Sequence, residues 1–300
     1  MSGDRHASRR TQGHHGIRAG TTIAPMSVDL PGRFRLTVLG CSNAVPHPLS
    51  PASGYLVEWE ETAILLDIGQ GVVRRLQGML DPRSLSGVIV GHMHADHYFD
   101  LVGLRYLYPW AGRGENRLPI HLPPGGQDRL VALADAISER PAFFDDAFEV
   151  AEYDSDTTLR VGPLTVRFHR SQHYVPAWAT SIEAPDGTRL AYTGDSGPSD
   201  EMIEFTRGAD LLLVEAALRS AADDDPRRGH LTAEEAIDLA RGAQVKAALI
   251  VHYDPARRAQ LDELCESAGP WIRTALAGLT RTVPARAMPP VVTSPSVAAP

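Results

Sequence analysis

Four potential metal ligands are concentrated in the stretch Gly91-His92-Met93-His94-Ala95-Asp96-His97. Neutral imidazole and carboxylate are suitable ligands for a borderline divalent cation such as zinc. A solvated turn rich in histidine is the alternative, but His-x-His followed by an adjacent Asp-His pair favours metal binding. Four ligands in so short a loop exceed what one ion usually takes from one segment. The stretch therefore predicts a second ion, with further ligands from distant loops.

The flanking segments predict that this stretch is a turn between a strand and a helix. Gly87 to Val90 is a short apolar run typical of a buried strand, and the apolar residues from Tyr98 to Tyr108 recur at helical spacing. Several other apolar strands also end at an acidic residue or a histidine. Because sites in layered α/β folds form at strand ends, we expect these side chains to meet there. They are Asp67, Asp195, Glu215 and His252.

The composition suits one α/β domain and excludes several other classes. The chain has 300 residues, is 43% hydrophobic and carries a formal net charge of −8, which argues against a broad basic face for nucleic acid. Its two cysteines, Cys41 and Cys265, are far apart in sequence and fit a reducing compartment. We find neither an apolar run that could span a membrane nor a secretory signal, and we expect a cytoplasmic protein.

The two ends of the chain differ in composition from the rest. Residues 1–31 are rich in Gly, Ser, Thr, Arg and His without periodicity, and residues 285–300 are dominated by Pro, Ala, Val and Ser. We predict a disordered leader at 1–31 and a disordered tail at 285–300 around a single folded domain at residues 32–284.

The motif His92-x-His94-x-Asp96-His97 resembles the signature of the metallo-β-lactamase fold, a superfamily of metal-dependent hydrolases. The resemblance covers essentially all of residues 34–284 and implies an α/β fold, a four-layer αββα sandwich. The run from Ala44 through Val57, with Leu65-Leu66-Asp67, is similar to the tRNA 3′-processing ribonucleases and to an actinobacterial group of cyclic-nucleotide phosphodiesterases. Ser50 to Tyr55 resembles the second group more closely, although Ala95 stands where the related class II phosphodiesterases carry Leu.

The resemblance also implies a ligand set for two ions, expected to be Zn²⁺ or alternatively Mn²⁺. Two such ions about 3.5–4 Å apart lower the pKa of a shared water, whose hydroxide attacks phosphorus or a carbonyl carbon. Asp96 or Asp195 would accept the proton of that water, and Asp67 would support the site. His169 rivals His173, but it lies inside a predicted strand. The implied ligands are His92, His94 and His173 for one ion, Asp96, His97 and His252 for the other, and Asp195 as the bridge.

His230, in His230-Leu231-Thr232, discriminates between substrate classes. Thr232 and Glu235 predict a capping box for a helix at 233–241, so His230 lies just before that helix. In the phosphodiesterase branches, a histidine in a His-x-Thr context contacts the phosphate and helps to protonate the leaving oxygen. Glu215 is a candidate to orient His230. A surface histidine before a helix cap is the alternative.

The sequence therefore favours a two-metal hydrolase of a small phosphodiester such as 3′,5′-cyclic AMP. A tRNA 3′-end endonuclease ranks second, because residues 145–156 are acidic where those enzymes carry a tRNA-gripping arm. A hydrolase of carboxylic esters, lactones or thiolesters ranks third. A metal-stabilised binding module without activity would require a missing ligand, and none is missing. The sequence leaves the oligomeric state open, and a homodimer is compatible with it.

Overall fold

The computed structural model describes residues 34–108, 117–140 and 142–283. The predicted leader at 1–31 and the predicted tail at 285–300 lie outside these ranges, so both remain predictions, as do the domain boundaries. Within the described ranges, no helix has both the length and the apolar character needed to cross a membrane.

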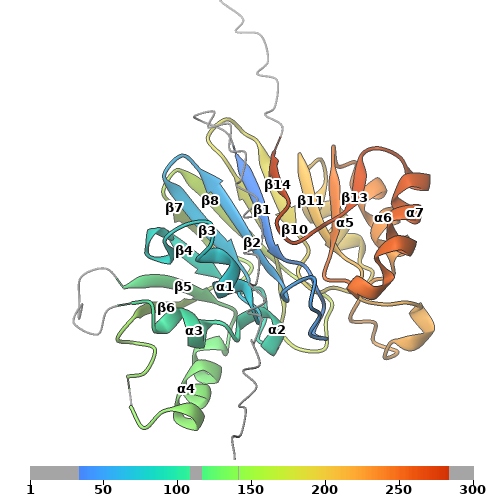
Figure 1. Cartoon of the computed structure of the whole chain (residues 1–300). Coiled ribbons are helices and arrows are strands. Elements are labelled where there is room, and N and C mark those ends of the chain that lie inside the picture. The colour runs from blue at the N-terminus through green and yellow to red at the C-terminus, as the bar shows by residue number, and fades with distance from the viewer. Residues whose placement is uncertain (1–33, 109–116, 141, 284–300) are drawn as a thin grey trace, which may run out of the picture. The chain divides into compact units, whose positions relative to one another are not determined.

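Two seven-stranded sheets form the centre of the described part of the chain (Figure 1). The first sheet has the order β14-β1-β2-β3-β4-β5-β6, with antiparallel pairing from β14 to β3 and parallel pairing from β3 to β6. Strands β2 and β3 form an antiparallel hairpin. The strands are β1 (Arg35–Gly40), β2 (Gly54–Trp59), β3 (Thr62–Leu66), β4 (Gly87–Ile89), β5 (Leu118–Leu122), β6 (Phe148–Glu152) and β14 (Thr280–Thr282).

The second sheet repeats this arrangement in the second half of the chain. Its order is β13-β12-β11-β10-β9-β8-β7, antiparallel from β7 to β10 and parallel from β10 to β13. A hairpin turn that contains Asp186 and Gly187 joins β9 to β10. The strands are β7 (Thr158–Val161), β8 (Leu164–Arg170), β9 (Trp178–Glu183), β10 (Arg189–Tyr192), β11 (Leu211–Glu215), β12 (Ala248–Val251) and β13 (Ile272–Thr274).

Helices cover the outer faces of both sheets, which gives the four layers implied by the resemblance. Alternate residues of β1 to β4 point to opposite faces, so Leu36 and Val57 pack toward the second sheet while Leu39 and Leu56 pack under the helices of the first. The α/β sandwich is therefore confirmed. The helices are α1 (Val72–Leu76), α2 (Ala95–Tyr98), α3 (Leu101–Arg105), α4 (Gly126–Ile137), α5 (Asp200–Thr206), α6 (Ala233–Gly242) and α7 (Arg258–Ala268), with short 3₁₀ turns at Pro82–Ser84, Ala221–Asp223 and Pro255–Arg257.

The acidic segment at residues 145–156 contains a strand that the sequence analysis did not identify. Phe148–Glu152 forms β6, the edge strand beside β5, with Phe148 buried and Glu149 exposed. An edge strand buries few side chains, so its apolar alternation is weak and the acidic residues dominate the pattern. The expected solvated acidic face is present on this strand.

The carboxyl ends of the parallel strands bring the predicted site residues together. Asp67 follows β3 and the metal-binding stretch follows β4, while Asp195 follows β10 and His252 follows β12. A hydrogen bond joins the two sheets at this edge. The Trp178 amide, at the start of β9 in the second sheet, donates to the carbonyl of Gly91, just after β4 in the first sheet, at 3.0 Å.

Candidate metal centre

The first group of ligands contains His92, His94, His173 and Asp195, whose donor atoms all lie within 4.8 Å of one another. His94 Nδ1 is 2.9 Å from His92 Nε2 and 3.2 Å from His173 Nε2. Asp195 Oδ2 is 3.6 Å from His92 Nε2. Three imidazole nitrogens and one carboxylate oxygen therefore converge on one point, as the ligands of a divalent cation do.

The second group contains Asp96, His97 and His252, all of them buried. His97 Nε2 lies 3.4 Å from Asp96 Oδ2 and 3.3 Å from Asp195 Oδ1. His252 Nε2 lies 3.3 Å from Asp195 Oδ2. Asp195 thus lies between the two groups, in the place that the sequence analysis assigned to a bridging ligand.

Hydrogen bonds at the far side of the rings fix the orientation of several histidines. The Nδ1 atom of His97 donates to Asp67 Oδ2 at 2.8 Å, and that of His173 donates to the Gly229 carbonyl at 2.8 Å. His252 Nδ1 is bonded to Ser53 Oγ at 2.9 Å. A ring whose Nδ1 carries the proton presents an Nε2 lone pair to the centre. These partners therefore prepare the nitrogens for metal binding.

The protonation states of His92, His94 and His173 also suit a cation. Burial lowers the pKa of His92 well below its usual value, and burial likewise lowers the pKa of His94 and His173, so these rings are neutral at physiological pH. Burial alone would raise the pKa of Asp195, but the surrounding imidazoles hold it well below the usual range. The His97 ring behaves differently: burial opposes its charge, but Asp195 and Asp67 raise its pKa well above the usual value.

Some buried polar atoms of the proposed ligands lack a hydrogen-bond partner, and two of them test whether metal ions fit. His97 Nε2 and Asp195 Oδ1 are both buried and unpartnered, although they lie only 3.3 Å apart. Leaving such atoms unsatisfied is costly in a protein interior. A cation held by the two groups of ligands would satisfy both atoms and would neutralise the converging carboxylates. The residues present therefore fit metal ions.

Two residues of the centre have a strained backbone conformation, as residues at functional sites often do. Asp67 has φ 56° and His252 has φ 47°, and both belong to the few non-glycine residues with positive φ among those described. Such conformations cost about 1–3 kcal/mol and persist only where the surroundings enforce them. Asp67 is held by the Gly91 amide, His97 and the Tyr192 hydroxyl, each at 2.8 Å. At Gly69, a Cβ would lie 2.0 Å from the Asp96 carbonyl oxygen, so glycine is required where the Asp67 turn meets α2.

His230 lies beside the centre. Its Nδ1 is 2.8 Å from Glu215 Oε1 and 3.9 Å from Asp195 Oδ2. Burial would lower its pKa, but the carboxylates of Glu215, Asp195 and Asp224 together outweigh burial and raise the pKa to about 9. The Asp224 carboxylate accepts from the Gly229 and His230 amides and thereby fixes this loop. Asp195, His230 and His252 form a third set of donors close enough to hold an ion, so the geometry alone leaves His230 either a ligand or a neighbour.

All of the site residues anticipated from the sequence lie in this one region, and the rival His169 does not. His169 lies in β8, where its ring stacks on Phe205 with the centroids 5.2 Å apart. Sequence reasoning missed three supporting residues, Ser53, Tyr192 and Asp224. Their contacts depend on tertiary packing, and only Tyr192, at the end of the strand before Asp195, had a position that could have revealed it.

The comparison with known families decides the assignment. The profile of the Beta-lactamase superfamily domain matches residues 62–253. This chain belongs to the β-lactamase superfamily. Its fold and its His/Asp groups able to bind metal ions confirm the sequence-based prediction of a metal-dependent hydrolase.

The similar proteins connect this superfamily member with hydrolases. An uncharacterized protein of Mycobacterium leprae is 34% identical over 249 residues, which are 81% of this chain and 82% of that protein. The probable metallo-hydrolase YhfI of Bacillus subtilis is 31% identical over 223 residues, 73% of this chain and 86% of YhfI. The YhfI crystal structure matches with a TM-score of 0.71 at 26% identity and covers 83% of this chain and 99% of that chain. A ribonuclease Z of Natronomonas pharaonis is 26% identical over 267 residues, 73% of this chain and 86% of that protein.

Proposed function

We propose that this protein is a two-metal, zinc-dependent phosphodiesterase whose substrate is a small phosphodiester such as 3′,5′-cyclic AMP. One observation carries the choice of a phosphodiester: His230, oriented by the buried Glu215, faces Asp195 at the edge of the metal centre. Such a residue serves a reaction whose alkoxide leaving group needs a proton. The relatives named ribonuclease Z also favour phosphodiester chemistry.

The proposed ligands are those in the two convergent groups, with Asp195 between them. Bound there, divalent ions would supply Lewis acidity and activate a water for attack. In this proposal, the carboxylate of Asp96 or of Asp195 takes the proton released by that water. The role of Asp67 is to hold the His97 ring through Nδ1.

His230 supplies the second proton transfer in this proposal. Because Glu215 occupies Nδ1, the proton available for donation is on Nε2. With a pKa raised to about 9, the ring carries that proton at neutral pH. It would pass to the leaving oxygen as the bond between phosphorus and oxygen breaks, which is general acid catalysis.

A side-by-side assay tests the proposal. Purified protein supplied with Zn²⁺ or Mn²⁺ would be offered cyclic AMP, a chromogenic phosphodiester, precursor tRNA and a lactone. We expect turnover of the first two. Lactone hydrolysis without phosphodiester hydrolysis would instead favour the carboxylic ester class, for which this superfamily fold is equally suitable.

The first expected result concerns metal content. We expect two divalent ions per chain in active protein, because the seven proposed ligands form two convergent groups, and Asp195 of the first group also lies 3.3 Å from His97 and His252 of the second. Elemental analysis after gel filtration measures the ratio, and restoring activity to chelated protein with added zinc or manganese provides the control. A single ion in fully active protein would contradict the two-metal proposal.

The second expected result concerns tRNA. Precursor tRNA should be cleaved with kcat/KM roughly 10²-fold or more below that of cyclic AMP, because tight nucleic-acid binding needs many phosphate contacts. Glu149 and Glu152 are exposed on β6, and Arg228 is paired with Glu235 at 2.7 Å. Cleavage assays at physiological salt make the comparison. Efficient cleavage after the discriminator base would move the tRNA endonuclease to first place.

A further inference from the structure

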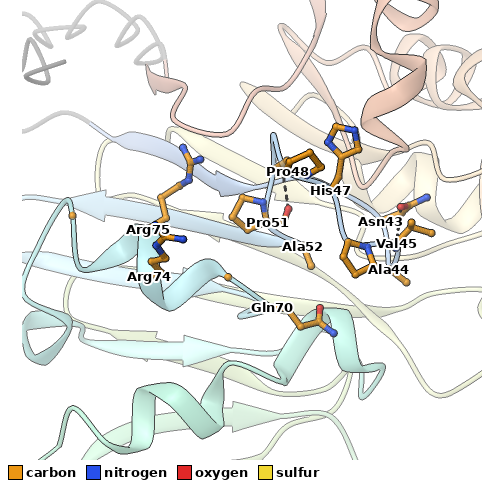
Figure 2. Close-up of a pocket in the computed structure, with 14 residues that line it drawn as sticks. Asn43, Ala44, Val45, His47, Pro48, Pro51, Ala52, Gln70, Arg74 and Arg75 are labelled. Carbon is orange, nitrogen blue, oxygen red and sulfur yellow. Dashed lines mark hydrogen bonds between the residues drawn. The ribbon is translucent and has the colours of Figure 1, made fainter. Parts of the chain in front are cut away.

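A pocket of about 690 Å³ opens between the β1–β2 loop and helix α1. None of the seven proposed ligands lines it. One wall carries Arg74 and Arg75 from the last turn of α1, and the other carries Asn43 and Val45 from the loop (Figure 2). The pocket therefore has walls of different chemistry, one cationic and one largely apolar.

The cationic wall is not neutralised by the protein. Arg74 is exposed and Arg75 is half-buried, and neither forms an ion pair with an acidic residue within the described ranges. No Asp or Glu lines the pocket, although the chain as a whole has a formal charge of −8. In contrast, Arg228 and Arg35 are both paired with glutamates at 2.7 Å. Two adjacent guanidinium groups without a carboxylate favour an anion, and a phosphate above all.

The opposite wall presents apolar surface to solvent. Val45 is 65% exposed, and three loop prolines, Pro46, Pro48 and Pro51, also line the pocket. The loop is held in place, since the Ser42 amide donates to the Pro51 carbonyl at 3.0 Å and the Asn43 amide to the Tyr253 carbonyl at 3.1 Å. A fixed apolar wall facing two arginines suits a nucleoside phosphate, with its base on the prolines and its phosphate on the arginines.

The pocket adjoins the metal centre through neighbouring residues. The Ala52 amide in the pocket wall donates to the Gln70 carbonyl at 3.2 Å, and the next residue, Ser53, is bonded to His252. Tyr253, which accepts from Asn43, directly follows His252. These bonds hold the β1–β2 loop, which forms one wall of the pocket, against the segment that carries His252.

We propose that this pocket binds a second phosphate of the substrate, so that the enzyme accepts 5′-phosphorylated linear dinucleotides such as pApA. This inference rests on the proposed phosphodiesterase function and enlarges its substrate class. Water adds to the internal phosphorus of pApA, the bond to the 3′ oxygen breaks, and that oxygen takes a proton. Each pApA then yields two molecules of AMP, while its 5′-phosphate is held by Arg74 and Arg75.

The test compares pApA with ApA, which lacks the 5′-phosphate, in metal-loaded protein. We expect the unaltered protein to prefer pApA by roughly tenfold in kcat/KM, as loss of charge-assisted hydrogen bonds to a phosphate predicts. The double variant Arg74→Gln/Arg75→Gln should abolish this preference, chiefly by raising KM for pApA. Its turnover of ApA and of bis(p-nitrophenyl) phosphate should be unchanged. Glutamine keeps the helix propensity of α1.

A matched variant, Arg160→Gln/Arg167→Gln, removes two exposed arginines from β7 and β8 and should keep the preference. Equal turnover of pApA and ApA by the unaltered protein, or a preference that survives in the Arg74/Arg75 variant, would overturn the inference. Acceleration of ApA cleavage by inorganic phosphate, with no preference for pApA, would assign the pocket to a separate effector and also overturn it.

Failure of the proposed function gives a different result. In that case cyclic AMP, ApA and bis(p-nitrophenyl) phosphate would all remain intact in every variant. Calorimetric titration with a non-cleavable methylenephosphonate analogue of pApA still tests the pocket, because the dissociation constant should rise roughly tenfold in the Arg74→Gln/Arg75→Gln variant alone. Equal affinity in both proteins would reject the phosphate site.

Discussion

Replacing Asp195 with alanine should remove both metal ions and almost all activity together. Asp195 Oδ1 lies 3.3 Å from His97 Nε2, and its Oδ2 lies 3.3 Å from His252 Nε2 and 3.6 Å from His92 Nε2. It is the carboxylate that lies between the two groups of ligands, so its loss leaves both groups incomplete and removes a charge that attracts cations. We expect kcat/KM to fall by more than about 10³-fold, since even one lost transition-state hydrogen bond typically costs 10²–10³-fold.

Three measurements make the Asp195 experiment decisive. Elemental analysis gives the metal content, hydrolysis of a chromogenic phosphodiester gives the activity, and circular dichroism shows that the fold persists. Asp195→Asn keeps the shape but removes the charge, and it should also lose metal. Asp200→Ala, at an exposed position at the start of α5, provides a matched control that should retain both ions. An Asp195→Ala protein that keeps two ions and normal turnover would exclude the bridging role.

The predicted site residues that the structure brings together share one property: a local sequence pattern indicates the place of each. His92, His94, Asp96 and His97 follow a short apolar run, and Asp195 and His252 each follow an apolar strand. Because sites in layered α/β folds form at strand ends, the apolar runs before these residues predict that the residues converge, and the resemblance to the superfamily implies the full ligand set. The capping box of Thr232 and Glu235 also formed as predicted, with the two bonds at 3.2 and 2.9 Å.

The parts that the sequence did not reveal depend on contacts between distant segments. Ser53 has no local feature that marks it, and it orients His252 only because the β1–β2 loop lies against the end of β12. The arginine pocket is similar, since Arg74 and Arg75 resemble any solvated pair until the fold places the loop opposite them. Strand β6 was missed because its acidic residues hide a pattern that rests on Phe148 and Val150.

The effect of replacing His230 with alanine should depend on the leaving group. His230 lies 3.9 Å from Asp195 and is bonded through Nδ1 to Glu215, so Nε2 is the atom that can donate a proton. For cyclic AMP, whose leaving group is an alkoxide, we expect turnover to fall by roughly 10²–10⁴-fold, the usual range for general acid catalysis. For bis(p-nitrophenyl) phosphate the loss should be much smaller, because nitrophenolate departs without a proton.

The metal content of the His230→Ala protein shows whether His230 is a metal ligand or only a neighbour of the ligands. Retention of both ions places His230 outside the ligand set, whereas loss of an ion would identify the set of Asp195, His230 and His252 as a true site. Glu215→Gln is the matched variant, because it keeps the contact with Nδ1 but removes the charge that raises the pKa of His230. The Glu215→Gln protein should lose part of its turnover of cyclic AMP and little of its turnover of bis(p-nitrophenyl) phosphate. An equal loss on both substrates in His230→Ala would make His230 a phosphate-binding residue, and no loss on either would remove the main reason for preferring phosphodiesters to carboxylic esters.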